Sequence, residues 1–340
     1  MLLMVCKQLR SIIRREGVGD NLKFQVTVRP KDRYPKGEGV VHRLQTLHYL
    51  CVTELQLQRT SMRGCFFEIR SILTALPRLR SLDVSDNNLY TTDIWEIAHE
   101  MLHLNTSLTK FSIGGNSEGA GMSDFIQQMC TFLKDLDVSR MSLETQTIRR
   151  MESVLPIASL EKLNLFGNFM TFNNMRRIVR GLAINTSLTS LDLGANNFWH
   201  STANDMAELL AKNTTITALG IARIQARHAC TVLNGITSAN TTLTHLDISE
   251  IRFAGSISED SIAAMLRGNT PIRVLDLSNC KMLPWTVVTV AEAVSQHSTL
   301  TSLRLVGNSM VSRYTIPVLC NLARTCTRLV ELHIGTSKMV

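Results

Sequence analysis

Apolar and polar residues alternate in short segments that recur along most of the chain. One segment runs Leu79-Arg-Ser-Leu82-Asp-Val84-Ser-Asp-Asn87-Asn-Leu89, which follows the pattern L-x-x-L-x-L-x-x-N-x-L. Its centre has the two-residue period of a strand with one buried face. Eleven copies begin 25 to 29 residues apart, at Val52, Leu79, Leu108, Leu133, Leu160, Leu188, Ile216, Leu243, Ile272, Leu300 and Leu329. Such repetition predicts a solenoid of stacked units.

Between these segments the apolar spacing changes to three and four, as in Ile94, Ile97, Ala98, Met101 and Leu102. This spacing predicts an amphipathic helix after each strand. A unit of one strand and one helix cannot bury its apolar face alone, so neighbouring units must stack. We therefore expect an α/β horseshoe, with a parallel sheet on the concave side and helices on the convex side.

The ninth position of the segment is usually asparagine, at Asn87, Asn116, Asn168, Asn196 and Asn308. Its amide can pair with backbone groups where the chain turns out of the strand. Other residues occupy this position at Met141, Ile224, Ile251, Cys280 and Ser337. We expect the turns at Met141, Ile224, Ile251 and Ser337 to be looser or differently paired.

Residues 52–340 resemble the ribonuclease-inhibitor-like class of leucine-rich repeats, in the near-28-residue unit and the helical spacing between strands. The class commonly tolerates cysteine at the ninth position, as at Cys280. The resemblance implies a solenoid of about eleven repeats and, since most members bind other macromolecules, binding rather than catalysis. Members include nuclease inhibitors, activators of the Ran GTPase, tropomodulin-type actin binders, sensor arrays and subunits of cytoskeletal or organellar assemblies.

The first 51 residues form a separate segment in this interpretation. Leu22, Phe24, Val26 and Val28 alternate with polar residues, which predicts a degenerate first repeat that caps the array of residues 52–340. Residues 1–15 form a basic amphipathic helix in this prediction, with Lys7, Arg10, Arg14 and Arg15 as docking residues. We expect an uncleaved capping or docking helix, with a mitochondrial presequence as the alternative.

Charge and composition narrow the classes of function. The net charge of +8 is concentrated at the start, where residues 1–50 hold ten Lys and Arg against four Asp and Glu. An acidic surface such as tubulin or RNA therefore fits the N-terminal segment better than the array. Hydrophobic residues make up 44% and aromatic residues 5% of the chain, which favours thin repeated layers over one thick core.

Cysteine and asparagine usage favours an intracellular setting. The eight cysteines lack the close pairs that hold zinc or cap secreted arrays. N-x-Ser/Thr sequons begin at Asn105, Asn185, Asn213 and Asn240, each just after a predicted helix. We expect each of these to be a left-handed helix cap rather than a glycosylation site. The sequence contains no apolar run of the length a membrane-spanning helix needs.

A search for catalytic, metal and phosphate motifs yields nothing specific. His99 and His103 are one helical turn apart but lack the glutamate of a zinc protease motif. The glycines between Gly114 and Gly121 lack the Lys-Ser/Thr of a phosphate-binding loop, so we expect an irregular turn. We therefore expect no catalytic residue, no metal, no cofactor and no small-molecule substrate.

Binding is the remaining function, and the outward strand positions should line the concave face. They form an acidic row that ends in basic residues, with flanking cations and one aromatic ring. The predicted partner-binding residues are Asp83, Lys110, Asp137, Lys162, Asn164, Phe166, Asp192, Arg223, His245, Asp247, Asp276 and Arg304. Trp199 and His200 are expected on the rim. Aspartate is also usual at this position in the repeat class, so the row has a structural explanation as well.

The function expected from these features is a non-enzymatic scaffold for protein partners, or a structural subunit of a larger assembly. A cytoplasmic, cytoskeletal, ciliary or axonemal setting is favoured over RNA, because no aromatic residues are interleaved with the basic ones. A mitochondrial or ribonucleoprotein assembly is an alternative. A second alternative is a GTPase activator that resembles the Ran regulator, although residues 336–340 are not acidic as in that family.

Overall fold

The computed structural model describes residues 24–27, 52–59, 70, 76, 78–104, 107–253, 256–268, 270–308 and 313–335. The chain forms two compact units, one of Met1–Val154 with Ala158–Leu160 and one of Leu155–Ile157 with Glu161–Val340. Lys7, Arg10, Arg14 and Arg15 lie outside the described residues, as do Asn105 and Ser337. The proposed boundary between residues 51 and 52 stays a prediction.

The described part of the first unit has five parallel strands in sequence order: β1 (Phe24–Thr27), β2 (Val52–Gln56), β3 (Ser81–Asp83), β4 (Lys110–Ser112) and β5 (Asp135–Asp137). Its described helices are α4 (Thr91–Leu104), α5 (Met122–Phe132) and α6 (Thr145–Val154). Strand β1 coincides with the alternating residues predicted for a degenerate first repeat, and it pairs in parallel with β2.

The second unit begins with a short 3-10 helix, η1 (Leu155–Ile157). Its parallel strands are β6 (Lys162–Asn164), β7 (Ser190–Asp192), β8 (Ala218–Gly220), β9 (His245–Asp247), β10 (Val274–Asp276), β11 (Ser302–Arg304) and β12 (Glu331–His333). Its helices are α7 (Phe172–Leu182), α8 (His200–Lys212), α9 (Ala226–Ala239), α10 (Ser256–Arg267), α11 (Pro284–Gln296) and α12 (Thr315–Thr325).

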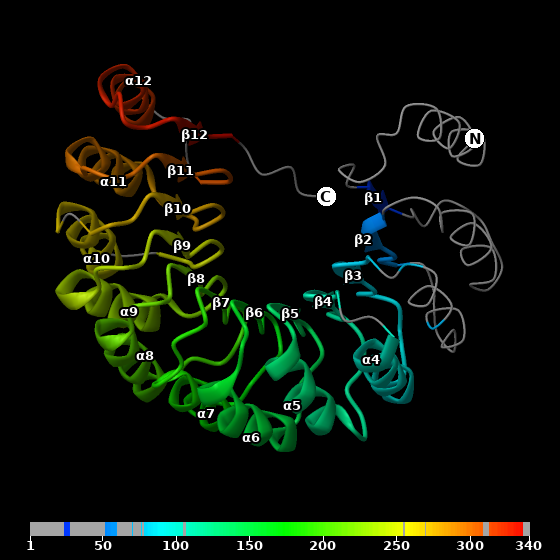
Figure 1. The fold of residues 1–340 in the computed structure, drawn as a ribbon. Coiled ribbons are helices and arrows are strands. Elements are labelled where there is room, and N and C mark those ends of the chain that lie inside the picture. Colours follow the sequence, from blue (N-terminus) through cyan, green and yellow to red (C-terminus); the bar gives the residue numbers. More distant parts are fainter. Residues whose placement is uncertain are drawn as a thin grey trace, which may run out of the picture. The chain divides into compact units, whose positions relative to one another are not determined.

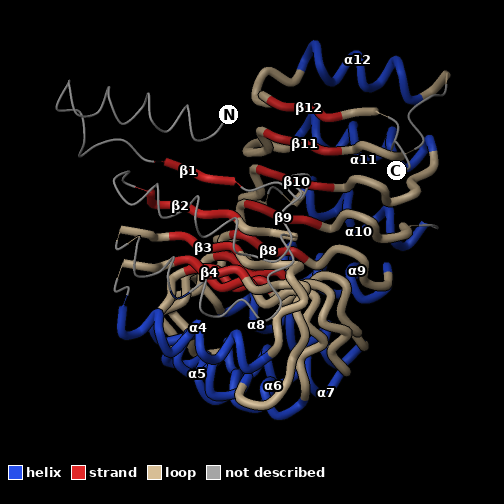
Figure 2. The backbone as a smooth tube through the Cα atoms, turned by 90° about the vertical axis from the view of Figure 1, so that its right-hand side faces the viewer, coloured by secondary structure: helices blue, strands red, loops and turns tan. Residues whose placement is uncertain are grey.

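Within the second unit the strands lie side by side in one layer and the helices form a second layer behind them (Figures 1 and 2). Every strand segment predicted from the sequence is a strand, and from β3 onward the described strands alternate with helices. The structure is therefore a leucine-rich-repeat solenoid, as predicted. We call the side of the sheet away from the helices the open sheet face.

The core lies between the strands and the helices. Leu191 and Leu193 are buried, at 1% and 0% exposure, while Asp192 between them stays partly exposed. Helices α8 and α9 pack closely because Gly235 faces Ala207, where a Cβ on residue 235 would lie 2.5 Å from the Ala207 Cβ. Burial of one leucine side chain contributes about 2 kcal/mol, repeated in each layer.

The turn after each strand has one repeated conformation. The eighth position is left-handed throughout the described repeats, at Arg59, Asp86, Gly115, Arg140, Gly167, Ala195, Arg223, Glu250, Asn279 and Gly307. Where asparagine occupies the ninth position, its side chain is buried and forms hydrogen bonds with the neighbouring repeat. Asn196 donates to the Leu165 and Leu193 carbonyls, each at 3.0 Å, and its Oδ1 accepts from the Met170 amide at 3.1 Å. The predicted role of this amide is confirmed.

Repeats without this asparagine keep the same backbone turn. Met141, Ile224 and Ile251 are buried apolar side chains, and the residue before each one is still left-handed. These turns therefore keep the backbone conformation but are paired without the amide, which is the second of the two predicted outcomes. Cys280 donates its thiol to the Ile248 carbonyl at 3.3 Å. Burial raises the pKa of the Cys280 thiol to about 12, so the proton needed for this bond is retained.

The asparagines that follow the helices correct one expectation. Asn213 and Asn240 are extended, with φ of −77° and −78°, and are not left-handed caps. The Oδ1 of Asn240 accepts from the Thr242 and Leu243 amides, and its Nδ2 donates to the Leu210 carbonyl of the preceding repeat. This bonding gives a structural reason for the position of the sequon, because the amide nitrogen of Asn240 is already engaged.

The glycine-rich segment from Gly114 to Gly121 is an irregular turn, as predicted. Gly121 has a φ of 94° and lies under the Trp95 ring. Within the same segment, the Glu118 carboxylate accepts hydrogen bonds from the Glu144 amide and the Thr147 hydroxyl at the start of α6. The segment therefore serves to connect adjacent repeats.

Candidate functional site

The open sheet face of the second unit brings the predicted row of polar residues together. The strand register places Asp192 beside Gly220, Gly220 beside Asp247, Asp247 beside Asp276, and Asp276 beside Arg304. Adjacent strands lie about 4.8 Å apart, so these side chains are immediate neighbours. In the first unit the same position holds Asp83, Ser112 and Asp137.

Each aspartate of the row also has a structural role. One carboxylate oxygen accepts from the backbone amide two residues later, as in Asp247 to Ser249 at 2.9 Å and Asp276 to Ser278 at 2.8 Å. Asn164 makes the same bond with its amide oxygen, to the Phe166 amide at 3.0 Å. The turn therefore requires an oxygen acceptor at this position but does not require a negative charge.

A hollow of about 230 Å³ lies in the row where β8 has small residues, Ala218 and Gly220. The carboxylates of Asp192, Asp247 and Asp276 line it, together with His245 and Arg304. Gly220 is required for this shape, because a Cβ there would lie 2.7 Å from an Asp192 carboxylate oxygen. Arg304 lies 3.7 Å from the Asp276 carboxylate, which bounds the hollow with a cation.

Two other predicted residues, Phe166 and Arg223, lie at the edge of this face and contact each other. The Phe166 ring lies against Gly194, and the Arg223 guanidinium lies 5.5 Å from the ring centroid. Arg223 also pairs with Glu250 at 2.7 Å. Phe166 is consequently half-buried, and these contacts hold Arg223 in place beside the strand ends.

The two flanking lysines differ from each other. The Lys110 ammonium lies 3.2 Å from the Asp135 carboxylate on the next strand, so much of its charge is balanced within the first unit. Lys162, on β6, has an exposed side chain. His245 is exposed beside the hollow, with its Nδ1 2.9 Å from the Thr244 hydroxyl.

The rim has more exposed aromatic surface than predicted. Trp199 is 61% exposed and packs against Phe172, with ring centroids 5.6 Å apart. Phe169 is also exposed, at 72%, which the sequence did not predict. Its position directly after Asn168, in the turn that follows the strand, could have indicated exposure. His200 is also exposed and lies one helical turn from Asn204.

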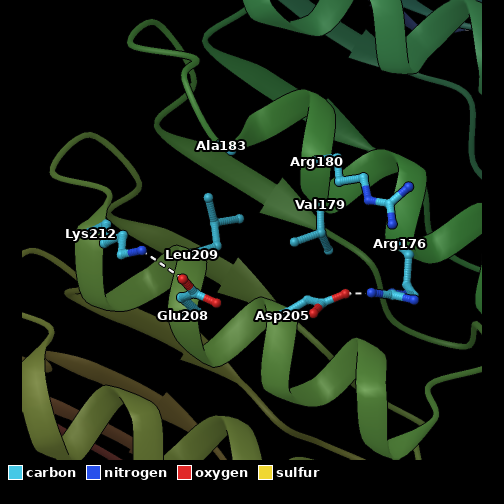
Figure 3. A pocket seen from close by; sticks show the side chains of 8 residues that line it. All are labelled: Arg176, Val179, Arg180, Ala183, Asp205, Glu208, Leu209 and Lys212. Carbon is cyan, nitrogen blue, oxygen red and sulfur yellow. Dashed lines mark hydrogen bonds and ion pairs between the residues drawn. The ribbon is translucent and has the colours of Figure 1, made fainter.

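A second hollow, also of about 230 Å³, lies between α7 and α8 (Figure 3). Arg176 and Asp205 point toward one another across it at 2.6 Å, and Lys212 pairs with Glu208 at 2.6 Å. Both acidic groups are thus paired within the chain. The open sheet face, where several carboxylates are adjacent, is therefore the better candidate site.

The described residues show neither a group of three potential metal ligands nor a helix long and apolar enough to cross a membrane. His99, considered above as a ligand, stacks on Trp95 with ring centroids 5.4 Å apart.

No family model matches the chain. Two curated proteins are similar to part of it. One is the mouse Capping protein, Arp2/3 and myosin-I linker protein 2, 27% identical over 52% of this chain. The other is the human NACHT, LRR and PYD domains-containing protein 13, 23% identical over 61% of it. The aligned regions amount to 14% and 20% of those proteins' own lengths.

Solved structures with the same fold include the leucine-rich repeat-containing protein LegL7 of Legionella pneumophila. It has a TM-score of 0.55 and 16% identity, over 91% of this chain and 98% of LegL7. The complex of Rad7 and Elc1 in yeast gives a TM-score of 0.51 and 15% identity, over 81% of this chain and 75% of its match. Together with the repeated strand, asparagine turn and helix, these likenesses identify the chain as a leucine-rich repeat protein.

Proposed function

We propose that this chain is a non-enzymatic scaffold that binds a basic segment of a partner protein on the open sheet face. The observation behind the proposal is the hollow at Gly220, which is lined by the carboxylates of Asp192, Asp247 and Asp276. In this proposal one Lys or Arg side chain of the partner enters the hollow. The rest of the basic segment lies across the neighbouring strands.

The dimensions and charge of the hollow favour a side chain over a free small molecule. Its volume of about 230 Å³ is below the range of about 300–1,000 Å³ typical of small-molecule pockets. Each turn needs one oxygen of the aspartate as an acceptor for the backbone but does not need its negative charge. A cation would gain a charge-assisted hydrogen bond there.

The proposal can be tested because asparagine conserves the turn. Asp247→Asn with Asp276→Asn removes two negative charges while keeping the oxygen acceptor that Asn164 demonstrates. Binding of a fluorescent lysine-rich peptide should weaken about ten-fold and lose much of its salt dependence. The matched control is Asp260→Asn with Glu292→Gln, two exposed helical acids. An equal loss in both variants would show that only net charge matters, which would contradict the proposal.

The setting we propose is cytoskeletal, with a ciliary or axonemal assembly as its narrower form. It is supported by the likeness to the mouse linker protein, whose name refers to capping protein, Arp2/3 and myosin-I. The yeast complex supports the use of this fold in binding another protein. Co-sedimentation with actin filaments and with microtubules would test the setting, and absence from both pellets would reject it.

The basic segment with Lys7, Arg10, Arg14 and Arg15 is proposed to contact an acidic surface of the same assembly, such as tubulin. Deleting residues 1–15 should weaken co-sedimentation with microtubules while the circular dichroism spectrum of the array is unchanged. Retained affinity at low ionic strength would contradict this role.

The alternative function as a GTPase activator has its own test. Unchanged GTP hydrolysis by a panel of GTP-loaded small GTPases, after this protein is added, would exclude activity on those GTPases.

A further inference from the structure

The last described repeat exposes apolar positions that the preceding repeat buries. Strand pairing aligns Leu303 with Leu332, which defines equivalent positions in the two repeats. In that alignment Leu305 is 0% exposed and Ile334 is 50% exposed. On the helices, Val287 is 0% exposed and its equivalent Ile316 is 51% exposed. The difference arises because each inner repeat is covered by the next one.

The strand at this end is also uncovered in the part of the chain that the structure describes. Strand β12 is the outermost strand of the second unit's sheet (Figure 2), and Val330 just before it is 81% exposed. An open strand edge readily accepts another strand. We call Ile316, Cys320, Ala323, Val330, Leu332 and Ile334 the terminal face.

We propose that the terminal face binds a second copy of this chain, through antiparallel pairing of β12 with β12 of that copy. A two-fold axis at Leu332 would set Leu332 opposite itself, Val330 opposite Ile334, and Glu331 opposite His333. Both apolar positions thus meet apolar positions, and an acid meets an imidazole. The segment is self-complementary in hydrophobicity and in charge.

The helical part of the terminal face fits the same symmetry. Ile316, Cys320 and Ala323 are spaced four and three residues apart, so they lie along one side of α12. The two-fold axis would bring the α12 helices of the two copies together in antiparallel orientation, with this side at the contact. The guanidinium of the nearby Arg328 is engaged within its own copy, since it donates to the Ser295 carbonyl of the preceding repeat at 3.3 Å.

The hydrogen bonds around Glu331 favour this register over a parallel one. Glu331 accepts from the Ser302 hydroxyl at 2.8 Å and lies 3.4 Å from the His333 Nε2. Antiparallel pairing would add the imidazole of the second copy to the same carboxylate. Parallel pairing in register would instead set Glu331 opposite Glu331, and like charges directly opposite destabilise a strand pair.

Sedimentation velocity of the full chain tests the proposal first. The chain has a mass of 38.0 kDa, and we expect a concentration-dependent species of twice that mass. Ile316→Arg and Ile334→Arg should each raise the dissociation constant at least about ten-fold, because a charge enters an apolar contact. Both residues are already half-exposed, so thermal unfolding should be unchanged at a concentration where all the variants are monomeric. Ile184→Arg, at a site 72% exposed elsewhere on the second unit, is the matched control.

A charge exchange tests the register. His333→Glu should raise the dissociation constant about ten-fold, because it sets Glu331 opposite a glutamate. Adding Glu331→His should restore the original value to within about two-fold, since acid and imidazole are then opposite again.

Cross-linking gives an independent readout. Cys320 is exposed on α12, so a short bis-maleimide should join two copies, and Cys320→Ser should abolish that product. A monomer at all concentrations would overturn the proposal, and so would a dimer unaffected by Ile316→Arg and Ile334→Arg. The Asp247→Asn and Asp276→Asn variant should dimerise normally, which separates this inference from the proposed function.

Discussion

Two repeats of the second unit form the same turns with different chemical groups. The repeat that begins at Leu188 has an asparagine at both turns, Asn196 after the strand and Asn213 after the helix. The repeat that begins at Ile272 has Cys280 and His297 at the equivalent positions. Both regions form the same turns, so the fold requires suitable donors and acceptors at these positions rather than asparagine itself.

The difference between the regions lies in protonation. An amide does not titrate, whereas the His297 Nδ1 must be unprotonated to accept from the Leu300 amide at 3.1 Å and the Thr299 amide at 3.4 Å. His297 is 1% exposed. Burial lowers the pKa of its imidazole, with a hydrogen bond to the Thr270 backbone opposing this change and the charge of Arg328 adding to it. The second region should therefore be the one that responds to pH.

The largest expected effect comes from removing an amide in the first region. Asn196→Ala should lower the free energy of unfolding by about 3 kcal/mol, because several buried backbone groups lose their partner. Urea unfolding would measure the loss. Asn197→Ala is the matched control, since this adjacent side chain is exposed and should change stability by less than about 0.5 kcal/mol. Equal losses in the two variants would mean that the buried asparagine side chain contributes little to the stability of the fold.

A smaller, pH-dependent effect is expected at His297. Because the folded-state pKa is lowered, the unfolded chain binds more protons below the ordinary imidazole pKa, and stability falls as the pH drops through that range. His297→Asn should reduce the difference between urea midpoints at pH 7 and pH 5. Burial also lowers the pKa of His228, so part of the pH dependence should remain. An unchanged difference would exclude His297 as its source.

The smallest effect is expected at Cys280. Cys280→Ala should cost about 1 kcal/mol, because a thiol is a weaker donor than an amide. In the native protein, a thiol reagent should modify the exposed Cys320 well before Cys280, whose pKa burial raises to about 12. Rapid modification of Cys280 would indicate that this turn opens readily, in contrast with the buried position described above.

The sequence predicted the strands, the helices and the buried asparagine turn because each depends on a local period or a fixed offset. It also placed Asp192, Asp247 and Asp276 in one row, since the strand positions repeat. It did not predict the hollow, which depends on Gly220 and Ala218 lying between larger neighbours on adjacent strands. The contact between Arg223 and the Phe166 ring likewise depends on packing between separate repeats.

The extended backbone at Asn213 and Asn240 shows a different limit of sequence reasoning. Residue type favoured a left-handed cap, yet these residues are held extended by bonds to the amides two and three residues later. The wrong prediction came from treating the helix end alone. In the solenoid, the Asn240 amide also bonds the preceding repeat, and that constraint cannot be read from a single helix.

Gly115 in the first unit has a consequence for how that part of the chain resists force. Because residue 115 has no side chain, the Asp86 carboxylate extends past it and pairs with Arg140 two repeats away, at 3.1 Å. A chain of repeats bound only to their immediate neighbours would peel apart one at a time under tension. This ion pair adds a contact between repeats that are not immediate neighbours, so Arg140→Ala should slightly lower the force at which these three repeats detach in an optical-tweezers trace.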